Sequence, residues 1–399
     1  MVHFIHIADC HLGSFREDKL RQISMDSFIQ VIDTAISRDV DFILIAGDLF
    51  NTALPSIEVL TQTISQLKKL KEKNIPVYFI AGSHDYSAAG KTMLSVLEET
   101  DLAINVLKGD IVENKLQLQY ITDEKTGIHL CGILGRAQAL EKSYYELLDH
   151  EHLAKVTGTK IFLFHSAITE YKPDKLKDSP STALSFLPKG FTYYAGGHVH
   201  MRFNEQVGTH GKIVYPGPTF PNSFSEIEEL ECGSFAYTQI NDGNVETVIE
   251  KIKRKNYQNI TLSVKGKTPT QIEEELESIT IIPDSIITLR LKGKLYSGSL
   301  LDINLTKIIQ QWMNQGAYII LKNTLSVESE QFTEELVHMD TEQLEEKIIN
   351  EHLGKISIDG NEKEIIIQLM KGLLTSKQDG ETANDFEKRV IGGYHEIFN

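Results

Sequence analysis

The sequence has few cysteines and no long apolar segment. Its three cysteines, Cys10, Cys131 and Cys232, are far apart and form no C-x-x-C motif, so neither a disulfide framework nor a zinc knuckle is predicted. This usage fits a reducing, intracellular compartment. No apolar run approaches the ~20 residues that a membrane-spanning helix needs. The N-terminal residues lack the basic region and cleavage site of a signal peptide. We therefore expect a cytoplasmic protein with no membrane segment.

The sequence also lacks the excess of basic residues that often marks a nucleic-acid-binding protein. It has 40 Lys and Arg against 56 Asp and Glu, which gives a formal net charge of −16. The acidic residues are unevenly distributed, because the stretch 328–352 holds nine of them and a single basic residue, Lys347. Bound metal ions would add positive charge that a count of residues omits. The overall charge therefore does not exclude a nucleic-acid substrate.

Apolar residues predict strands and helices in alternation through the first half of the chain. Buried strands are expected at 3–8, 41–46 and 76–81, and amphipathic helices lie between them at 19–38 and 56–73. This order predicts right-handed crossovers and a sheet covered by helices. Helical patterns become rarer beyond residue 110, where further strands are expected at 116–121, 128–133, 160–164, 191–195, 212–215 and 234–240. We predict an α/β fold with two packed sheets flanked by helices.

The second half of the chain predicts smaller units. After a basic segment at 251–256, strands are expected at 260–264, 286–291 and 318–321, with helices at 270–278 and 304–314. An acidic stretch and two short amphipathic helices, 364–374 and 384–398, follow. With 399 residues, more than one domain is expected. The predicted divisions are a first domain 1–250, a small α/β domain 256–325, an acidic linker with some helix 326–360 and a helical segment 364–399.

Five motifs place an Asp or a His directly after a predicted strand. They are Asp9 and His11 (A-D-C-H), Asp48 (A-G-D-L-F), His84 and Asp85 (A-G-S-H-D), His165 (F-L-F-H-S), and His198 and His200 (G-G-H-V-H). The carboxyl ends of strands meet at one edge of an open α/β sheet, so these side chains are expected to converge. In extended backbone, the two i, i+2 pairs would each point one way and bind one ion together. Imidazoles mixed with carboxylates favour manganese, iron or zinc over calcium or magnesium.

Each motif alone has a simpler interpretation. A single Asp after a strand usually caps a helix, and a buried His usually makes a hydrogen bond in the core. The recurrence of five such motifs, each at a strand end, favours a metal centre. The other nine histidines are interpreted as structural, and Cys10 is expected to point away from the metals because side chains alternate along a strand.

The five motifs resemble the signatures of the calcineurin-like metallophosphoesterases over about residues 1–240. The segments 5–12 (IHIADCHL), 46–50 (AGDLF) and 197–200, followed by Tyr215-Pro216-Gly217, resemble one branch in particular. That branch is the meiotic-recombination-eleven/SbcD-type DNA double-strand-break repair nucleases. The small α/β domain and the terminal helices are similar in order and size to its capping domain and its ATPase-docking helices.

This resemblance implies roles for individual residues. Asp9, His11, Asp48 and His200 would hold a first manganese ion, and Asp48, Ser83, His165 and His198 a second one, with Asp48 bridging the two. His84 would contact the scissile phosphate and the leaving oxygen, with Asp85 orienting its ring. The implied activity is a two-metal, manganese-dependent DNA exonuclease and endonuclease in double-strand-break repair. The implied partners are DNA and an SMC-like ABC ATPase bound by the C-terminal helices, and a homodimer is expected.

Two residues depart from the pattern of this branch. Ser83 stands where an Asn ligates through its amide oxygen, and Asn51 stands where a His often helps to seat the DNA backbone. These departures keep open a non-enzymatic alternative, in which a degraded site serves as a scaffold for the ATPase. A second alternative is another enzyme of the superfamily, such as a protein phosphatase or a cyclic-nucleotide phosphodiesterase, although these lack the region after about residue 256. Metal content and nuclease activity would separate the three.

Overall fold

The computed structural model describes residues 1–87, 92–136 and 140–328, together with Ile365 and Phe386. The chain divides into two compact units. The first comprises Met1–Thr261, Thr280–Arg290 and Ile309–Asn323, and the second comprises Leu262–Ile279, Leu291–Ile308 and the described residues from Thr324 onward. Within the described ranges, no helix combines the length and the apolar character needed to cross a lipid bilayer.

The first unit contains a six-stranded sheet in the order β14-β13-β1-β2-β3-β4. Its strands are β1 (Val2–Ile7), β2 (Phe42–Ala46), β3 (Val77–Ile80), β4 (Ile104–Asn105), β13 (Gly233–Asn241) and β14 (Asn244–Ile252). The first four run parallel, whereas β13 pairs antiparallel with β1 and forms a hairpin with β14. Every residue of β2 and β3 is buried, which explains their continuous apolar sequences. The strands predicted at 41–46 and 76–81 are confirmed.

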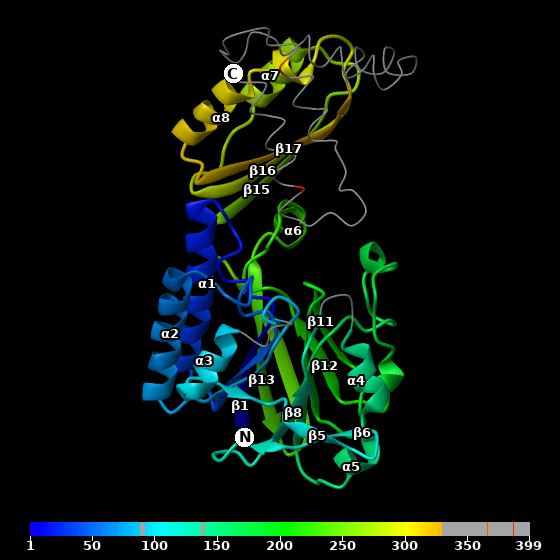
Figure 1. Cartoon of the computed structure of the whole chain (residues 1–399). Coiled ribbons are helices and arrows are strands. Elements are labelled where there is room, and N and C mark those ends of the chain that lie inside the picture. The colour runs from blue at the N-terminus through cyan, green and yellow to red at the C-terminus, as the bar shows by residue number, and fades with distance from the viewer. Residues whose placement is uncertain (88–91, 137–139, 329–364, 366–385, 387–399) are drawn as a thin grey trace. The chain divides into compact units, whose positions relative to one another are not determined.

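Three helices cover the outer face of this sheet (Figure 1): α1 (Asp18–Ser37), α2 (Ile57–Glu72) and α3 (Met93–Glu99). Phe28 of α1 and Leu67 of α2 are fully buried against apolar strand residues such as Ile43. The helix α2 begins where the Ser56 side chain accepts a hydrogen bond from the Val59 N–H. Both helices expected in this region are confirmed, with ends displaced by one residue at most.

A second six-stranded sheet has the order β11-β12-β10-β9-β8-β7. Its strands are β7 (Ile121–Thr122), β8 (His129–Ile133), β9 (Lys160–His165), β10 (Tyr193–Gly197), β11 (Arg202–Gln206) and β12 (Lys212–Pro216). Its apolar cluster includes Tyr145 of α4 (Lys142–Leu147) and Leu153 of α5 (His150–Ala154). The short hairpin β5 (Gly109–Val112) and β6 (Lys115–Leu118) and the helix α6 (Phe224–Leu230) complete this part.

The two sheets pack face to face. Phe4, Phe42 and Leu44 of the first sheet share one buried cluster with Leu163 and Tyr193 of the second. This packing confirms the predicted pair of sheets flanked by helices. The edge strands β11 and β14 were not expected from the sequence, because most of their side chains are partly or fully exposed and give no buried pattern.

The remaining described elements follow in the predicted order. They are β15 (Asn256–Ser263), α7 (Pro269–Glu277), β16 (Ser285–Lys294), α8 (Leu305–Asn314) and β17 (Ile319–Glu328), and the strands form a sheet in the order β15-β16-β17. Short 3-10 helices cover Asp174–Leu176, Leu184–Phe186 and Leu300–Asp302. The predicted domain limits remain predictions. The linker 326–360 and the helical segment 364–399 lie almost entirely outside the described residues.

Candidate metal centre

The predicted site residues meet where both sheets end. Asp9 and His11 follow β1, Asp48 follows β2, and Ser83, His84 and Asp85 follow β3; His165 closes β9, and His198 and His200 follow β10. Three groups have potential ligand atoms within 4.8 Å of one another: Asp9, His11 and His200; His11, Asp48 and His84; and Asp9, Asp48 and His165. The structure therefore brings the five motifs together, as their positions after strands predicted.

The local backbone differs from the extended form that was expected. Asp9, His11, Asp48, His198 and His200 all have a positive φ, between 43° and 94°. Such left-handed backbone is uncommon for residues other than glycine. The first strand's turn is fixed by hydrogen bonds from the Asp9 and His11 N–H groups to the Gly47 and Asp48 carbonyls, at 3.1 and 3.0 Å.

This geometry separates one of the two i, i+2 pairs. Asp9 and His11 join the same group of ligand atoms, together with His200. The His198 ring instead lies against His165, with ring centroids 5.2 Å apart. His198 and His200 were expected to point the same way and bind one ion together, whereas the structure places His200 beside Asp9 and His11 and the His198 ring against His165.

Two glycines make room for the ligands. A Cβ atom on Gly82 would lie 2.1 Å from Asp48 Oδ1, and one on Gly47 would lie 2.2 Å from His165 Nδ1. Both separations are far below van der Waals contact, so any larger residue would displace a ligand. The glycines beside the motifs are thus explained by the close packing of the site itself.

Asp48 lies at the middle of the centre. One of its carboxylate oxygens accepts a hydrogen bond from the His84 N–H at 2.8 Å, and the other lies 3.1 Å from His165 Nε2 and 3.4 Å from Ser83 Oγ. Burial alone would raise the pKa of Asp48, but His165 holds that pKa far below its usual range. Burial opposes protonation of His165, yet Asp48 and Asp9 raise its pKa to about 10. Without a metal ion, a proton on His165 therefore balances part of the buried negative charge.

Two other imidazoles are held neutral. Burial lowers the pKa of His11 to about 3 and that of His198 to about 4. Neutral imidazole is the form that binds metals. The His11 and His200 Nε2 atoms lie only 3.0 Å apart, a separation at which two nitrogens share either a proton or a cation. Buried carboxylates beside converging imidazole nitrogens fit a divalent metal ion.

Glu226 of α6 is a site residue that the sequence did not reveal. Its Oε2 lies 3.0 Å from His200 Nδ1. A carboxylate on the outer nitrogen of a metal-binding His fixes the tautomer that turns the other nitrogen to the metal. The only local signal is the spacing Ser223-x-x-Glu226, typical of a helix start, and Ser223 does cap α6. Nothing in that pattern connects α6 with His200.

The Asp85 carboxylate has other hydrogen-bond partners than the His84 ring, which was expected to be its partner. Its carboxylate accepts hydrogen bonds from the N–H groups of Leu49, Phe50 and Gly82, at 2.9 to 3.1 Å. The His84 ring is instead held through Nδ1, which lies 2.9 Å from the Asn51 carbonyl oxygen. The expectation that Asp85 orients the His84 ring is therefore corrected. Asp85 fixes the loops after β2 and β3, and burial raises its pKa to about 7.

Cys10 points away from the ligands, as expected, and is buried in the apolar cluster between the first sheet and its helices.

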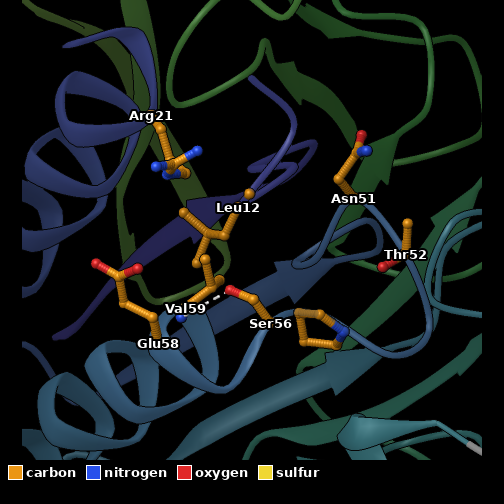
Figure 2. Close-up of a pocket in the computed structure, with 9 residues that line it drawn as sticks. Leu12, Arg21, Asn51, Thr52, Ser56, Glu58 and Val59 are labelled. Atoms are coloured by element: carbon orange, nitrogen blue, oxygen red, sulfur yellow. Dashed lines mark hydrogen bonds between the residues drawn. The ribbon is translucent and has the colours of Figure 1, made fainter. Parts of the chain in front are cut away.

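A pocket of about 310 Å³ opens beside the centre, between the loops after β1 and β2 and the start of α2. Figure 2 shows Leu12 and Asn51, neighbours of the ligand motifs, on its wall together with Arg21 and Glu58. Asn51 thus holds His84 through its backbone carbonyl and is also one of the residues that line this pocket.

Comparison with known proteins identifies the family. The model of the calcineurin-like phosphoesterase family matches residues 2–202, a segment that contains all five motifs. The chain is also similar to three archaeal proteins named DNA double-strand break repair protein Mre11. That of Methanococcus maripaludis is 28% identical over 242 residues, which are 58% of this chain and 60% of the relative. That of Sulfolobus acidocaldarius is 28% identical over 70% of this chain and 69% of the relative.

The third relative, from Methanocaldococcus jannaschii, is 26% identical over 98% of this chain and its own whole length. The chain thus spans between 60% and all of the length of these three relatives. The segment matched by the family model covers half of the chain and carries every candidate metal ligand. The resemblance predicted from the motifs is confirmed: this chain belongs to the calcineurin-like phosphoesterases.

Proposed function

We propose that this metal-dependent phosphoesterase is a DNA nuclease, which cleaves phosphodiester bonds with two manganese ions during double-strand-break repair. The observation that carries the proposal is the convergence of Asp9, Asp48, His11, His165 and His200 on one buried point at the edge of both sheets. DNA as the substrate is supported by the names of the archaeal relatives, one of which matches 98% of this chain. Both exonuclease and endonuclease activity are included in the proposal.

The residues divide into two ligand sets. Asp9, His11 and His200 form one set, and His165, His198 and Ser83 the other, with Asp48 shared by both. Mixed nitrogen and oxygen donors suit manganese. When bound, divalent ions would supply positive charge to the phosphate oxygens. They would also lower the pKa of a bound water towards neutral pH. The Ser83 hydroxyl is a weaker donor than an amide, so we assign the lower affinity to the second set.

His84 is the residue assigned to the leaving oxygen. Its side chain is exposed, while its ring lies 4.7 Å from that of His11 between centroids. The Asn51 carbonyl oxygen at Nδ1 orients the ring, and from the imidazolium form Nε2 would donate its proton to the departing 3′ oxygen. This role places one proton donor beside the ligand cluster without making it a ligand.

Two partners complete the proposal. An SMC-like ABC ATPase would dock on residues 364–399, of which only Ile365 and Phe386 belong to the described part of the chain. Truncation after Asp359 tests this: the shortened protein should stay folded and cleave small phosphodiesters, but no longer co-purify with the ATPase. A homodimer is supported by Leu54, Ile57 and Val96, apolar side chains exposed by 38 to 83% near the start of α2 and on α3. Sedimentation of an Ile57→Glu variant tests the dimer.

The decisive assay is manganese-dependent degradation of end-labelled linear duplex DNA, with an RNA and a phosphopeptide as controls. We expect DNA to be cut, and we expect Asp48→Ala to lose both metal ions and the activity. Hydrolysis of the phosphopeptide alone would identify another enzyme of the family. If the protein binds no metal and cuts none of the three substrates, the scaffold alternative would be supported.

A further inference from the structure

Arg136 is a cation held between two aromatic rings next to the metal centre. Arg136 comes after β8 and directly follows Gly135 in the chain. Gly135 packs so closely on His165 that a Cβ atom there would be 2.4 Å from the imidazole. The Gly135 N–H donates to the Ala81 carbonyl, just before the loop that carries Ser83 and His84. Arg136 is therefore tied to both loops that supply the second ligand set.

Two contacts of the side chain and one of the backbone hold Arg136. The guanidinium carbon lies 5.0 Å from the centre of the Tyr86 ring and 5.9 Å from that of Tyr144. The backbone N–H of Arg136 donates to the buried Glu141 carboxylate at 3.1 Å. Cation–π contacts hold a guanidinium in place without using its N–H donors. The side chain is thus oriented in advance by contacts that use none of its N–H donors.

One donor of the Arg136 guanidinium is left without a partner among the described residues. Its Nε is buried and has no hydrogen-bond partner, and across the described residues the guanidinium makes no ion pair. A buried donor without a partner destabilises the folded protein. A half-buried cation held in this way is typical of a site that is completed by an anion.

We propose that Arg136 binds a phosphate of the polynucleotide next to the scissile phosphate. The planar guanidinium matches two phosphate oxygens. The guanidinium contacts Tyr86 and Tyr144, and no contact with a candidate metal ligand is found among the described residues, so we assign it to a phosphate beside the reacting one. The inference rests on the proposed nuclease function. Its consequence is a preference for polymeric substrates over small diesters.

The test compares Arg136→Gln and Arg136→Lys with the wild-type full chain, using a DNA oligonucleotide and bis(p-nitrophenyl) phosphate in manganese. For the oligonucleotide, Arg136→Gln should raise KM about tenfold, as expected for loss of a hydrogen bond to a charged group, and leave kcat within about twofold. The slope of log KM against log salt concentration should fall by about 0.7–0.9. Arg136→Lys should keep the slope, because it keeps the charge. Both constants for the small diester should stay unchanged.

Arg38→Gln is the matched control. Arg38 also lies over a tyrosine, 4.7 Å from the Tyr237 ring centre, but it is paired with Glu250. It should leave KM and the salt slope unchanged, which separates a phosphate contact from a general effect of charge. Equal melting temperatures would show that the variants are folded.

Two results would overturn the inference. One is an oligonucleotide KM and salt slope of Arg136→Gln equal to those of the wild type, and the other is an equal loss on both substrates. If the wild type hydrolyses the small diester but leaves DNA uncut, the proposed nuclease function fails instead. Fluorescence anisotropy with the same oligonucleotide then still decides whether Arg136 contributes one phosphate contact to binding.

Discussion

Replacing Gly82 by alanine should disable the metal centre through a single methyl group. The added Cβ would lie 2.1 Å from Asp48 Oδ1 and 2.3 Å from the Asp48 backbone nitrogen. Neither atom belongs to the end of a flexible side chain, because the carboxylate is buried and the nitrogen is part of the turn. Gly82 has no left-handed φ, so alanine brings no backbone strain of its own, and the effect is one of space alone.

The size of the effect follows from that overlap. To restore van der Waals contact Asp48 must withdraw by about 1 Å, and a misplacement of this size costs about 10²-fold in rate. Because the two proposed ligand sets share Asp48, affinity for both ions should fall together. Calorimetric titration with manganese and turnover of bis(p-nitrophenyl) phosphate measure the two effects separately.

Gly208→Ala provides the control. Gly208 has a left-handed φ of +44° and open space around its Cβ position. Alanine there should cost about 1 kcal/mol of stability through backbone strain and leave metal affinity unchanged. If Gly82→Ala bound manganese as tightly as Gly208→Ala and turned over at a similar rate, the argument from close packing around Asp48 would be refuted.

Four further predictions concern the side chains of the centre. His84→Ala should retain its metal ions by titration but lose about 10²–10⁴-fold in turnover, since positioned acid–base groups contribute that much; simultaneous loss of metal would contradict the assigned role. Ser83→Asn should raise activity at low manganese by strengthening the second set, and an unchanged manganese dependence would count against Ser83 as a ligand. Because His165, with a pKa raised to about 10, must release its proton when metal binds, manganese affinity should rise with pH, by about tenfold per unit near neutrality; a flat profile between pH 6 and 8 would exclude this linkage. Glu226→Gln should weaken metal binding by about 10–100-fold through the loss of orientation at His200, and an unchanged dissociation constant would show that this contact is incidental.

Much of the fold was predictable, because the pattern of apolar residues in the sequence indicates which strands are buried and which faces of the helices are buried. The strand Phe42–Ala46 is apolar at every position and is buried at every position. The edge strand Arg202–Gln206 is polar and partly exposed, so no local pattern distinguishes it from a loop. The division of the chain into strands was therefore clear in the interior and incomplete at the edges.

The sequence predicted which residues gather at the site better than it predicted the contacts that those residues make. The motifs identified the residues that gather, since the position after a strand places a side chain at the sheet edge. The support for His84 comes from the backbone carbonyl of Asn51, and any residue at that position would offer a carbonyl. The partner of His200 comes from a helix 26 residues away, through a contact that no short motif encodes. Long-range contacts made by the backbone or by a cap residue leave no signature in the sequence.

The candidate ligands lie on the edges of two different sheets. The distance between these edges therefore depends on how the two sheets pack in the interior of the protein. Asp9 and Asp48 come from one sheet, while His165 and His200 come from the other. Near the centre the sheets approach through small residues, and a Cβ on Gly197 would lie 2.2 Å from the Ala46 carbonyl oxygen. The separation of the two edges is thus limited by the close-packed atoms beneath the site. Compression or heating that shifts one sheet against the other would change the reaction before it unfolded the chain.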